Sequence, residues 1–197
     1  MHKERTKTIY LNIQTKQMKF IKLLLSDLDN TIRRPKSGAT FINDPKDQEV
    51  IAEAAAALAR YHNDGWTVIG ITNQGGCSAI NPKTARPYKT IEDAIVEQEY
   101  TLELVPGLEA IYFCPDFEGK QCWKVTREIS AAMHGSFPNF TDFRKPGSGM
   151  LRLAMFLEVV MLEDTIYISD RPEDEQAAAD AKVKFLWASD WYQIAVN

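Results

Sequence analysis

The chain alternates between short apolar runs and longer amphipathic segments. The short runs show no alternation of apolar and polar residues, which is typical of strands buried on both faces of a parallel sheet. They lie at residues 21–25, 66–72, 109–113, 165–169 and 184–188. Most of the segments between them carry helix signals. This succession of strands and helices predicts an α/β fold whose central sheet is mostly parallel.

Helices are expected at residues 44–63, 91–104, 149–161 and 173–181. The first should open with Asp44 as its N-cap and Pro45 at the first helical position, because both residue types favour helix starts. Its buried stripe would consist of Val50, Ile51, Ala54, Ala55, Leu58 and Ala59. The segment 114–148 is interpreted as irregular. We therefore predict one Rossmannoid sheet wrapped by helices in three layers, with no second domain.

The composition is that of one soluble domain: 197 residues, of which 45% are apolar and 25% charged. Residues 1–19 carry positive charge without an apolar core, so they are interpreted as a poorly ordered extension ahead of a single domain at 20–197. No apolar run reaches membrane-spanning length. Three cysteines are too few for a disulfide framework and indicate a reducing, cytoplasmic location.

Polar residues follow three of the predicted strands where they end. The first strand is followed by Asp27 and Asp29, which point the same way if the chain is extended. The later strand ends and the loop before a helix add Thr72, Asn73, Asp170, Asp174 and Lys145. In open parallel sheets, ligands bind at the carboxyl ends of the strands. The sequence therefore predicts a site at this edge.

These residue types suit phosphoryl transfer. Two neighbouring carboxylates repel each other unless a cation lies between them, and Mg²⁺ is a hard ion that binds one or two carboxylates. Asp27 and Asp170 are the expected ligands. Asp27 can then attack phosphorus, and Asp29 can protonate the leaving alcohol and later activate water. Thr72, backbone N–H groups near Asn73 and Lys145 would hold the phosphoryl oxygens.

Four stretches carry a family resemblance: DLDNT (27–31), ITNQG (71–75), RKPGSGM (144–150) and ISDRPED (168–174). In this order they resemble the four motifs of the haloacid dehalogenase (HAD) superfamily. The resemblance implies an aspartyl nucleophile at Asp27, an acid/base at Asp29, and Mg²⁺ held by Asp27, the carbonyl of Asp29 and Asp170. Asp174 is a further candidate near the metal, where it would orient Lys145 or a bound water. Asn30 replaces the commoner glycine, and Asn accepts turn geometry.

TNQGG and RKPGSGM are similar to the branch of that superfamily with little or no cap domain. This branch includes polynucleotide 3′-phosphatases, histidinol-phosphate phosphatases and heptose-bisphosphate phosphatases. The stretch 31–47 looks closest to the 3′-phosphatase module of polynucleotide kinase/phosphatases. The preferred hypothesis is therefore a phosphatase of nucleic-acid 3′ ends. The alternatives are a phosphatase of a small phosphorylated metabolite and an inactive, phosphate-binding HAD-like domain.

A group of cations bears on the substrate. Arg33, Arg34 and Lys36 follow the nucleophile motif, where they would be either solvated surface or contacts to neighbouring phosphates of a nucleic acid. The loop after the second strand would extend this track with Lys83, Arg86 and Lys89. The net charge of −4 argues against it.

Cys114 and Cys122 are candidate zinc ligands, because heptose-bisphosphate phosphatases carry a zinc loop in this region. The stretch CPDFEGKQC lacks a tight second pair of ligands, and only His134 lies within reach along the chain. A structural zinc ion needs four ligands. Buried or free thiols are therefore the preferred interpretation.

Overall fold

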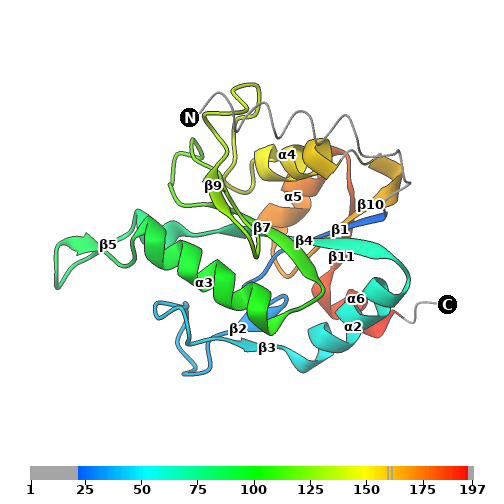
Figure 1. Ribbon diagram of the computed structural model, residues 1–197, viewed down its shortest axis with the longest axis horizontal. Helices are drawn as coiled ribbons and strands as arrows, with labels where there is room; N and C mark the ends of the chain where they lie inside the picture. Colours follow the sequence, from blue (N-terminus) through cyan, green and yellow to red (C-terminus); the bar gives the residue numbers. More distant parts are fainter. Residues whose placement is uncertain (1–21, 159, 161, 195–197) are drawn as a thin grey trace.

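The computed structural model describes residues 22–158, 160 and 162–194. The predicted extension at 1–19 lies outside these residues. A seven-stranded sheet forms the centre, in the order β11-β10-β1-β4-β7-β8-β9 (Figure 1). Its five parallel strands are β11 (Lys184–Trp187), β10 (Thr165–Ser169), β1 (Lys22–Ser26), β4 (Trp66–Asn73) and β7 (Leu108–Cys114). The predicted α/β fold with a mostly parallel sheet is confirmed.

Helices cover both faces of the sheet. On one face lie α4 (Gly149–Glu158) and α5 (Pro172–Ala181), and on the other lie α2 (Ala52–Asn63), α3 (Ile91–Leu104) and α6 (Ala188–Gln193) (Figure 1). Leu23 and Leu25 of β1 pack into the core below α4 and α5, whereas Leu24 packs into the core of the other face. Burial on both sides explains why the strand sequences show no alternation.

The first helix starts later than predicted. It begins at Ala52 instead of Pro45, and Asp44 instead caps a single turn by accepting a hydrogen bond from the backbone N–H of Lys46 at 2.9 Å. The residues that follow form β3 (Glu49–Val50), which pairs antiparallel with β2 (Arg33–Arg34). The buried stripe of α2 is Ala54, Ala57, Leu58 and Tyr61, so the predicted Ala55 and Ala59 are exposed.

The segment 114–148 is more regular than predicted. It contains β8 (Trp123–Val125) and β9 (Ser130–Ala132), which extend the sheet as antiparallel strands. The Trp123 ring stacks on Phe113 of β7, with ring centroids 6.4 Å apart. Such short strands give too few residues for a period to be seen. The predicted end of α4 at 161 falls partly outside the described residues.

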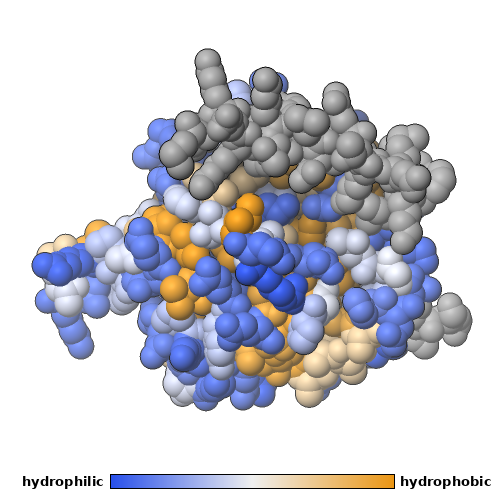
Figure 2. All heavy atoms as spheres, in the orientation of Figure 1, coloured by the Kyte–Doolittle hydropathy of each residue, from blue (hydrophilic) through white to orange (hydrophobic). Residues whose placement is uncertain are grey.

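The loop after β4 contains the 3₁₀ turn η1 (Gly75–Cys77) and a small hairpin, β5 (Ile80–Asn81) with β6 (Arg86–Pro87), that projects from the body (Figure 1). A second 3₁₀ turn, η2 (Leu162–Asp164), precedes β10. On the face of the molecule that is turned toward the viewer, Figure 2 shows exposed apolar patches among hydrophilic residues. No helix in the described part of the chain combines the length and apolarity needed to cross a membrane.

Candidate active site

The polar strand ends meet as predicted, because β10, β1 and β4 are neighbours in the sheet. The Thr31 hydroxyl lies 3.2 Å from Asp27 Oδ2 and 3.4 Å from Asp170 Oδ1, so it stands between the carboxylates that follow β1 and β10. Thr72, at the end of β4, donates to Asp29 Oδ2 at 3.4 Å. The carboxyl edge of the sheet therefore brings together residues from three distant parts of the sequence.

Lys145 is buried at the centre of this group. Its ammonium donates to Asp27 Oδ1 at 2.6 Å, to Asp174 Oδ2 at 2.9 Å, to the Ile71 carbonyl at 3.2 Å and to the Tyr167 hydroxyl at 3.3 Å. Burial alone would lower the pKa of Lys145, but the negative charge of Asp27, supported by Tyr167 and Asp174, holds that pKa well above its ordinary value. Lys145 is therefore a fixed positive charge beside the predicted nucleophile.

Burial of Asp27 outweighs the effect of Lys145 on its pKa. Burial raises the pKa of Asp27 to about 7; Lys145 opposes this shift, and the charges of Asp174 and Asp29 add to it. Burial also raises the pKa of Asp170. A further cation beside these carboxylates would stabilise their ionised forms.

The donor set fits Mg²⁺. Asp27 and Asp170 converge on the Thr31 hydroxyl, and Mg²⁺ is commonly held by one or two carboxylates with further oxygen ligands. Within the described ranges, no cluster of three or more His, Cys, Asp or Glu side chains is arranged to hold a metal ion. The carboxylates of Asp27 and Asp170 are thus candidate side-chain ligands, to which the family resemblance adds the main-chain carbonyl of Asp29.

Asp174 is placed differently from the other acidic residues. It is fully buried at the start of α5, where its Oδ2 accepts hydrogen bonds from Lys145 and from the Ser169 hydroxyl. The positive end of the helix dipole favours a negative charge at this position. Asp174 was predicted near the metal, to orient either Lys145 or a bound water, and its contact with the ammonium favours the first of these roles.

Asn73 contacts the lysine loop. Its side-chain Nδ2 donates to the Lys145 carbonyl and its Oδ1 accepts from the Lys145 backbone N–H, each at 3.1 Å. The Asn73 side-chain amide thus pairs with the backbone of Lys145 as the backbone of a neighbouring strand would. Asn73 was predicted to lie at the phosphate-binding part of the site, whereas both polar groups of its side chain contact the loop.

Glycines let that loop close tightly. A Cβ on Gly147 would lie 2.2 Å from the carbonyl oxygen of Asp142, and one on Gly149 would lie 2.0 Å from that of Thr141. Only a residue without Cβ fits such a close approach. The turn that presents Lys145 therefore requires glycine at positions 147 and 149.

The predicted cation track is wrong for two of its residues. Arg33 is fully buried, with its guanidinium paired to Asp29 at 3.0 Å and to Glu97 at 2.6 Å. Lys89 is buried and paired with Glu97. The sequence of a two-residue strand such as β2 does not reveal which side chain points inward. Arg34, next to Arg33, is exposed and pairs with Glu49 at 2.8 Å.

A pocket of about 490 Å³ opens above the carboxylates. Asp27, Asp29 and Lys145 line it, and so do three exposed aromatic residues, Phe41, Tyr88 and Phe117. The basic residues Arg144 and Arg171 also face it, and the Arg144 guanidinium lies 5.0 Å from the centre of the Phe117 ring. The pocket thus joins the acidic edge to an apolar and basic mouth.

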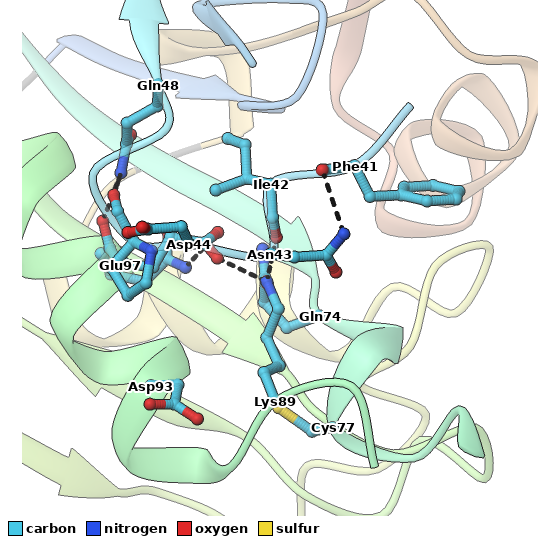
Figure 3. A network of polar contacts seen from close by, with 12 residues as sticks. Phe41, Ile42, Asn43, Asp44, Gln48, Gln74, Cys77, Lys89, Asp93 and Glu97 are labelled. Atoms are coloured by element: carbon cyan, nitrogen blue, oxygen red, sulfur yellow. Dashed lines mark hydrogen bonds and ion pairs between the residues drawn. The ribbon is translucent and has the colours of Figure 1, made fainter. Parts of the chain in front are cut away.

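A buried polar network that was not predicted from the sequence lies beside the pocket (Figure 3). Glu97 of α3 lies at its centre, with Thr101 one turn further along the same helix and Gln48 and Gln74 on neighbouring loops. A signal existed. The inward face of α3 carries Glu97, Gln98 and Thr101 beside the apolar Ala94 and Leu102, so it has three polar residues where a core helix would carry apolar ones.

Cys114 ends β7, where its backbone pairs with Asn73 of β4, and Cys122 lies just before β8. Cys114 and Cys122 are free and buried, and burial raises the pKa of Cys114 to about 12 and that of Cys122 well above its ordinary value. The His134 ring contacts the backbone of Cys122 through Nδ1, at 3.4 Å from the N–H and 3.3 Å from the carbonyl. Both thiols are therefore held in the neutral form.

Residues 22–185 match the model of a protein family described as polynucleotide kinase 3 phosphatase. The chain belongs to this family. It is a phosphatase of the HAD superfamily, a hydrolase that acts on phosphomonoesters. The match spans every motif identified in the sequence and runs from β1 into β11.

Relatives of this HAD phosphatase share about a quarter of its residues. It is 25% identical over 146 residues to the D-glycero-D-manno-heptose-1,7-bisphosphate 7-phosphatase of Thermosynechococcus vestitus, covering 72% of this chain and 66% of that protein. It is 25% identical over 166 residues to a Thermoplasma volcanium protein named "Probable D-glycero-D-manno-heptose-1,7-bisphosphate 7-phosphatase", covering 84% and 97%.

A solved structure shows the same fold. It is the D,D-heptose 1,7-bisphosphate phosphatase of B. bronchiseptica in complex with magnesium and phosphate, with 23% identity and a TM-score of 0.57. The alignment covers 84% of this chain and 79% of that one. Magnesium is thus found with this fold in a related phosphatase.

Proposed function

We propose that this HAD phosphatase works through an aspartyl-phosphate on Asp27 and depends on Mg²⁺. The observation that carries the proposal is the ion pair between Lys145 and Asp27, 2.6 Å long and buried below the pocket. A phosphate dianion entering the pocket would meet this cation beside the attacking oxygen. Fixed charges of this kind stabilise the charge that develops in phosphoryl transfer.

The reaction divides into two displacements. In the first, a carboxylate oxygen of Asp27 bonds to phosphorus, the bond to the leaving oxygen breaks, and Asp29 gives that oxygen a proton. In the second, Asp29 takes a proton from water as the water oxygen bonds to phosphorus and the bond to Asp27 breaks. Inorganic phosphate leaves, and both aspartates return to their starting state.

Asp27, Asp170 and the carbonyl of Asp29 would hold Mg²⁺, which would neutralise phosphate charge and relieve the repulsion around Asp27. Lys145 and the Thr72 hydroxyl would bind phosphoryl oxygens. Asp174 would keep Lys145 aimed at the reacting phosphate, because its buried carboxylate pairs with the ammonium at 2.9 Å.

For the substrate, we propose first a small sugar bisphosphate. The pocket volume of about 490 Å³ lies in the range of small-molecule sites. Arg144 and Arg171 face the same pocket and would bind a second phosphate. The relatives from Thermosynechococcus and Thermoplasma bear names of that substrate class.

A nucleic-acid 3′ end is the second candidate. The family match favours it, and so does the open, aromatic mouth, because exposed rings can stack on bases. The burial of Arg33 and Lys89 weakens it, because the cations that remain outside for a phosphate track are Arg34, Lys36, Lys83 and Arg86.

A substrate panel separates these proposals. Phosphate release would be measured with and without Mg²⁺ on 4-nitrophenyl phosphate, a heptose 1,7-bisphosphate, histidinol phosphate and a 3′-phosphorylated oligonucleotide. We expect Mg²⁺-dependent turnover with the highest kcat/KM on the bisphosphate. A preference for the oligonucleotide, with a rate that falls steeply with salt, would favour the second candidate. Metal-independent turnover would contradict the mechanism.

A further inference from the structure

Both oxygens of Asp29 are held by neighbours. Oδ1 accepts from Arg33 Nε at 3.0 Å, and Oδ2 accepts from the Thr72 hydroxyl at 3.4 Å. The Asp29 side chain is partly open to the pocket, whereas Arg33 is fully buried. The residue proposed as acid and base is therefore oriented from inside the protein.

The two contacts belong to one closed circuit of side chains. From Arg33 it continues through Glu97, which pairs with the guanidinium at 2.6 Å and also with the Lys89 ammonium. Lys89 donates to Gln74 Oε1 at 3.0 Å (Figure 3). Gln74 Nε2 then donates to the Thr72 hydroxyl at 3.2 Å, which closes the circuit at Asp29. We call these six residues the Asp29 ring.

The Asp29 ring is charge-balanced and anchored on several elements. Two carboxylates face two cations, and Gln48 and Thr101 accept hydrogen bonds from the remaining side of Arg33. Its members come from β2, β4 and α3, from the turn after β1, and from the short segments before η1 and before α3. Buried charges that are fully paired hold one geometry, because displacing any of them leaves its partner uncompensated.

The ring also decides where the proton sits. A guanidinium only donates hydrogen bonds, so Oδ1 must stay unprotonated to keep its contact with Arg33. The Thr72 hydroxyl can donate or accept, so Oδ2 is the oxygen that can carry a proton. Asp29 and Thr72 both line the pocket, so the oxygen through which they share a hydrogen bond lies at the pocket wall.

We propose that Arg33 and Glu97 are positioning residues for Asp29, which fix the carboxylate so that Oδ2 delivers the proton to the leaving oxygen. This inference rests on the proposed function, in which Asp29 is the general acid. By this proposal, the buried ion pair of Arg33 and Glu97 serves catalysis as well as the stability of the core.

The test uses the leaving group as its readout. An alkyl phosphate needs a proton on its leaving oxygen, whereas 4-nitrophenyl phosphate does not. For Arg33→Lys, we expect kcat/KM to fall by about 10–10² on the alkyl ester and by less than about threefold on the aryl ester. A lysine keeps the charge but cannot contact Asp29 and Glu97 together.

Two further variants guard against misfolding. Thr101→Val keeps every charge of the ring and removes one hydroxyl that Arg33 contacts, so we expect the same selectivity at smaller size. Arg127→Lys is the matched control: Arg127 binds the carbonyls of Leu102, Val105 and Pro106 at the end of α3, outside the Asp29 ring. Arg127→Lys should leave kcat/KM on both substrates unchanged. Thermal unfolding would show that each variant is folded.

A double-mutant cycle separates this inference from the proposed function. Asp29→Asn should lose the alkyl ester selectively, and adding Arg33→Lys should cost nothing more if Arg33 acts through Asp29. The positioning role would be overturned if Asp29→Asn were selective but folded Arg33→Lys and Thr101→Val lost activity equally on both esters. Additive losses in the double variant would overturn it as well. Failure of Asp29→Asn to show selectivity would instead overturn the acid/base assignment and, with it, this inference.

Discussion

Asn73 and Lys145 are joined by two hydrogen bonds of 3.1 Å, which run between the side-chain amide of one and the backbone of the other. The contact ties the lysine loop to the end of β4, so the position of the ammonium depends on an amide 72 residues away in sequence. An amide that donates and accepts at once suits this pairing, because the loop offers one carbonyl and one N–H.

The first prediction concerns this contact. Asn73→Asp should lower kcat more than Asn73→Ala, because a carboxylate oxygen would face the Lys145 carbonyl where Nδ2 now donates. Both variants should lose about 1–3 kcal/mol in free energy of unfolding, the usual cost of leaving buried polar groups unpaired. Urea unfolding and initial rates on an aryl phosphate would measure this. If only KM for substrate rose, with stability unchanged, Asn73 would bind phosphate directly instead.

The second prediction tests the nucleophile. Asp27→Asn should reduce turnover by more than roughly 10⁴-fold, as loss of the nucleophile does in other covalent hydrolases. The variant should remain folded, because Asn is nearly isosteric with Asp and Lys145 keeps its pairing with Asp174. Rates near those of the wild type would remove Asp27 from its assigned role.

The third prediction separates two acidic residues. Asp170→Asn should raise the Mg²⁺ concentration for half-maximal rate by more than the roughly 10–100-fold that loss of an outer partner costs. Asp174→Asn should lower kcat while changing that concentration little, because Asp174 holds Lys145. Mg²⁺ titrations of both variants would decide it. A large shift for Asp174→Asn would return this residue to the metal ligands.

The fourth prediction concerns the turn that presents Lys145. Gly147→Ala would place its Cβ 2.2 Å from a backbone oxygen, so the loop must move. We expect a loss of about 1–3 kcal/mol in free energy of unfolding, as overpacking costs, together with a lower kcat. Gly135→Ala is the matched control, because its Cβ would meet nothing within 4 Å. Equal stability of the two variants would contradict the tight turn.

Much of the site could be predicted because it lies where strands end. Asp27, Thr72 and Asp170 each follow a buried strand, and parallel strands deliver their carboxyl ends to one edge. Arg33 could not be placed, because nothing local distinguishes it from the exposed Arg34. The start of α2 differs from the prediction because pairing of Arg33 with Val50 in β2 and β3 overrides the helix signal at Asp44. Long-range contacts of this kind leave little trace in a single sequence.

The last prediction follows from the burial of Asp27. Its pKa rises from an ordinary 3.8 to about 7 on folding, chiefly through burial. Between these values the folded protein keeps a proton that the unfolded chain releases, so Asp27 makes stability fall as pH rises. Asp27→Asn lacks this group. In the presence of a chelator, the wild type should therefore lose free energy of unfolding relative to Asp27→Asn as pH rises from about 4 to about 7.

Urea unfolding of both proteins across this range would measure the difference, which cancels the titration of other groups. Mg²⁺ should reduce the loss, because a cation that binds only the folded protein stabilises the ionised carboxylate there. Asp170→Asn provides the control, since Mg²⁺ should have less effect on it. A stability difference that stays flat, or that grows in favour of the wild type as pH rises, would mean that Lys145 alone balances Asp27, and the case for a metal at this edge would lose its electrostatic basis.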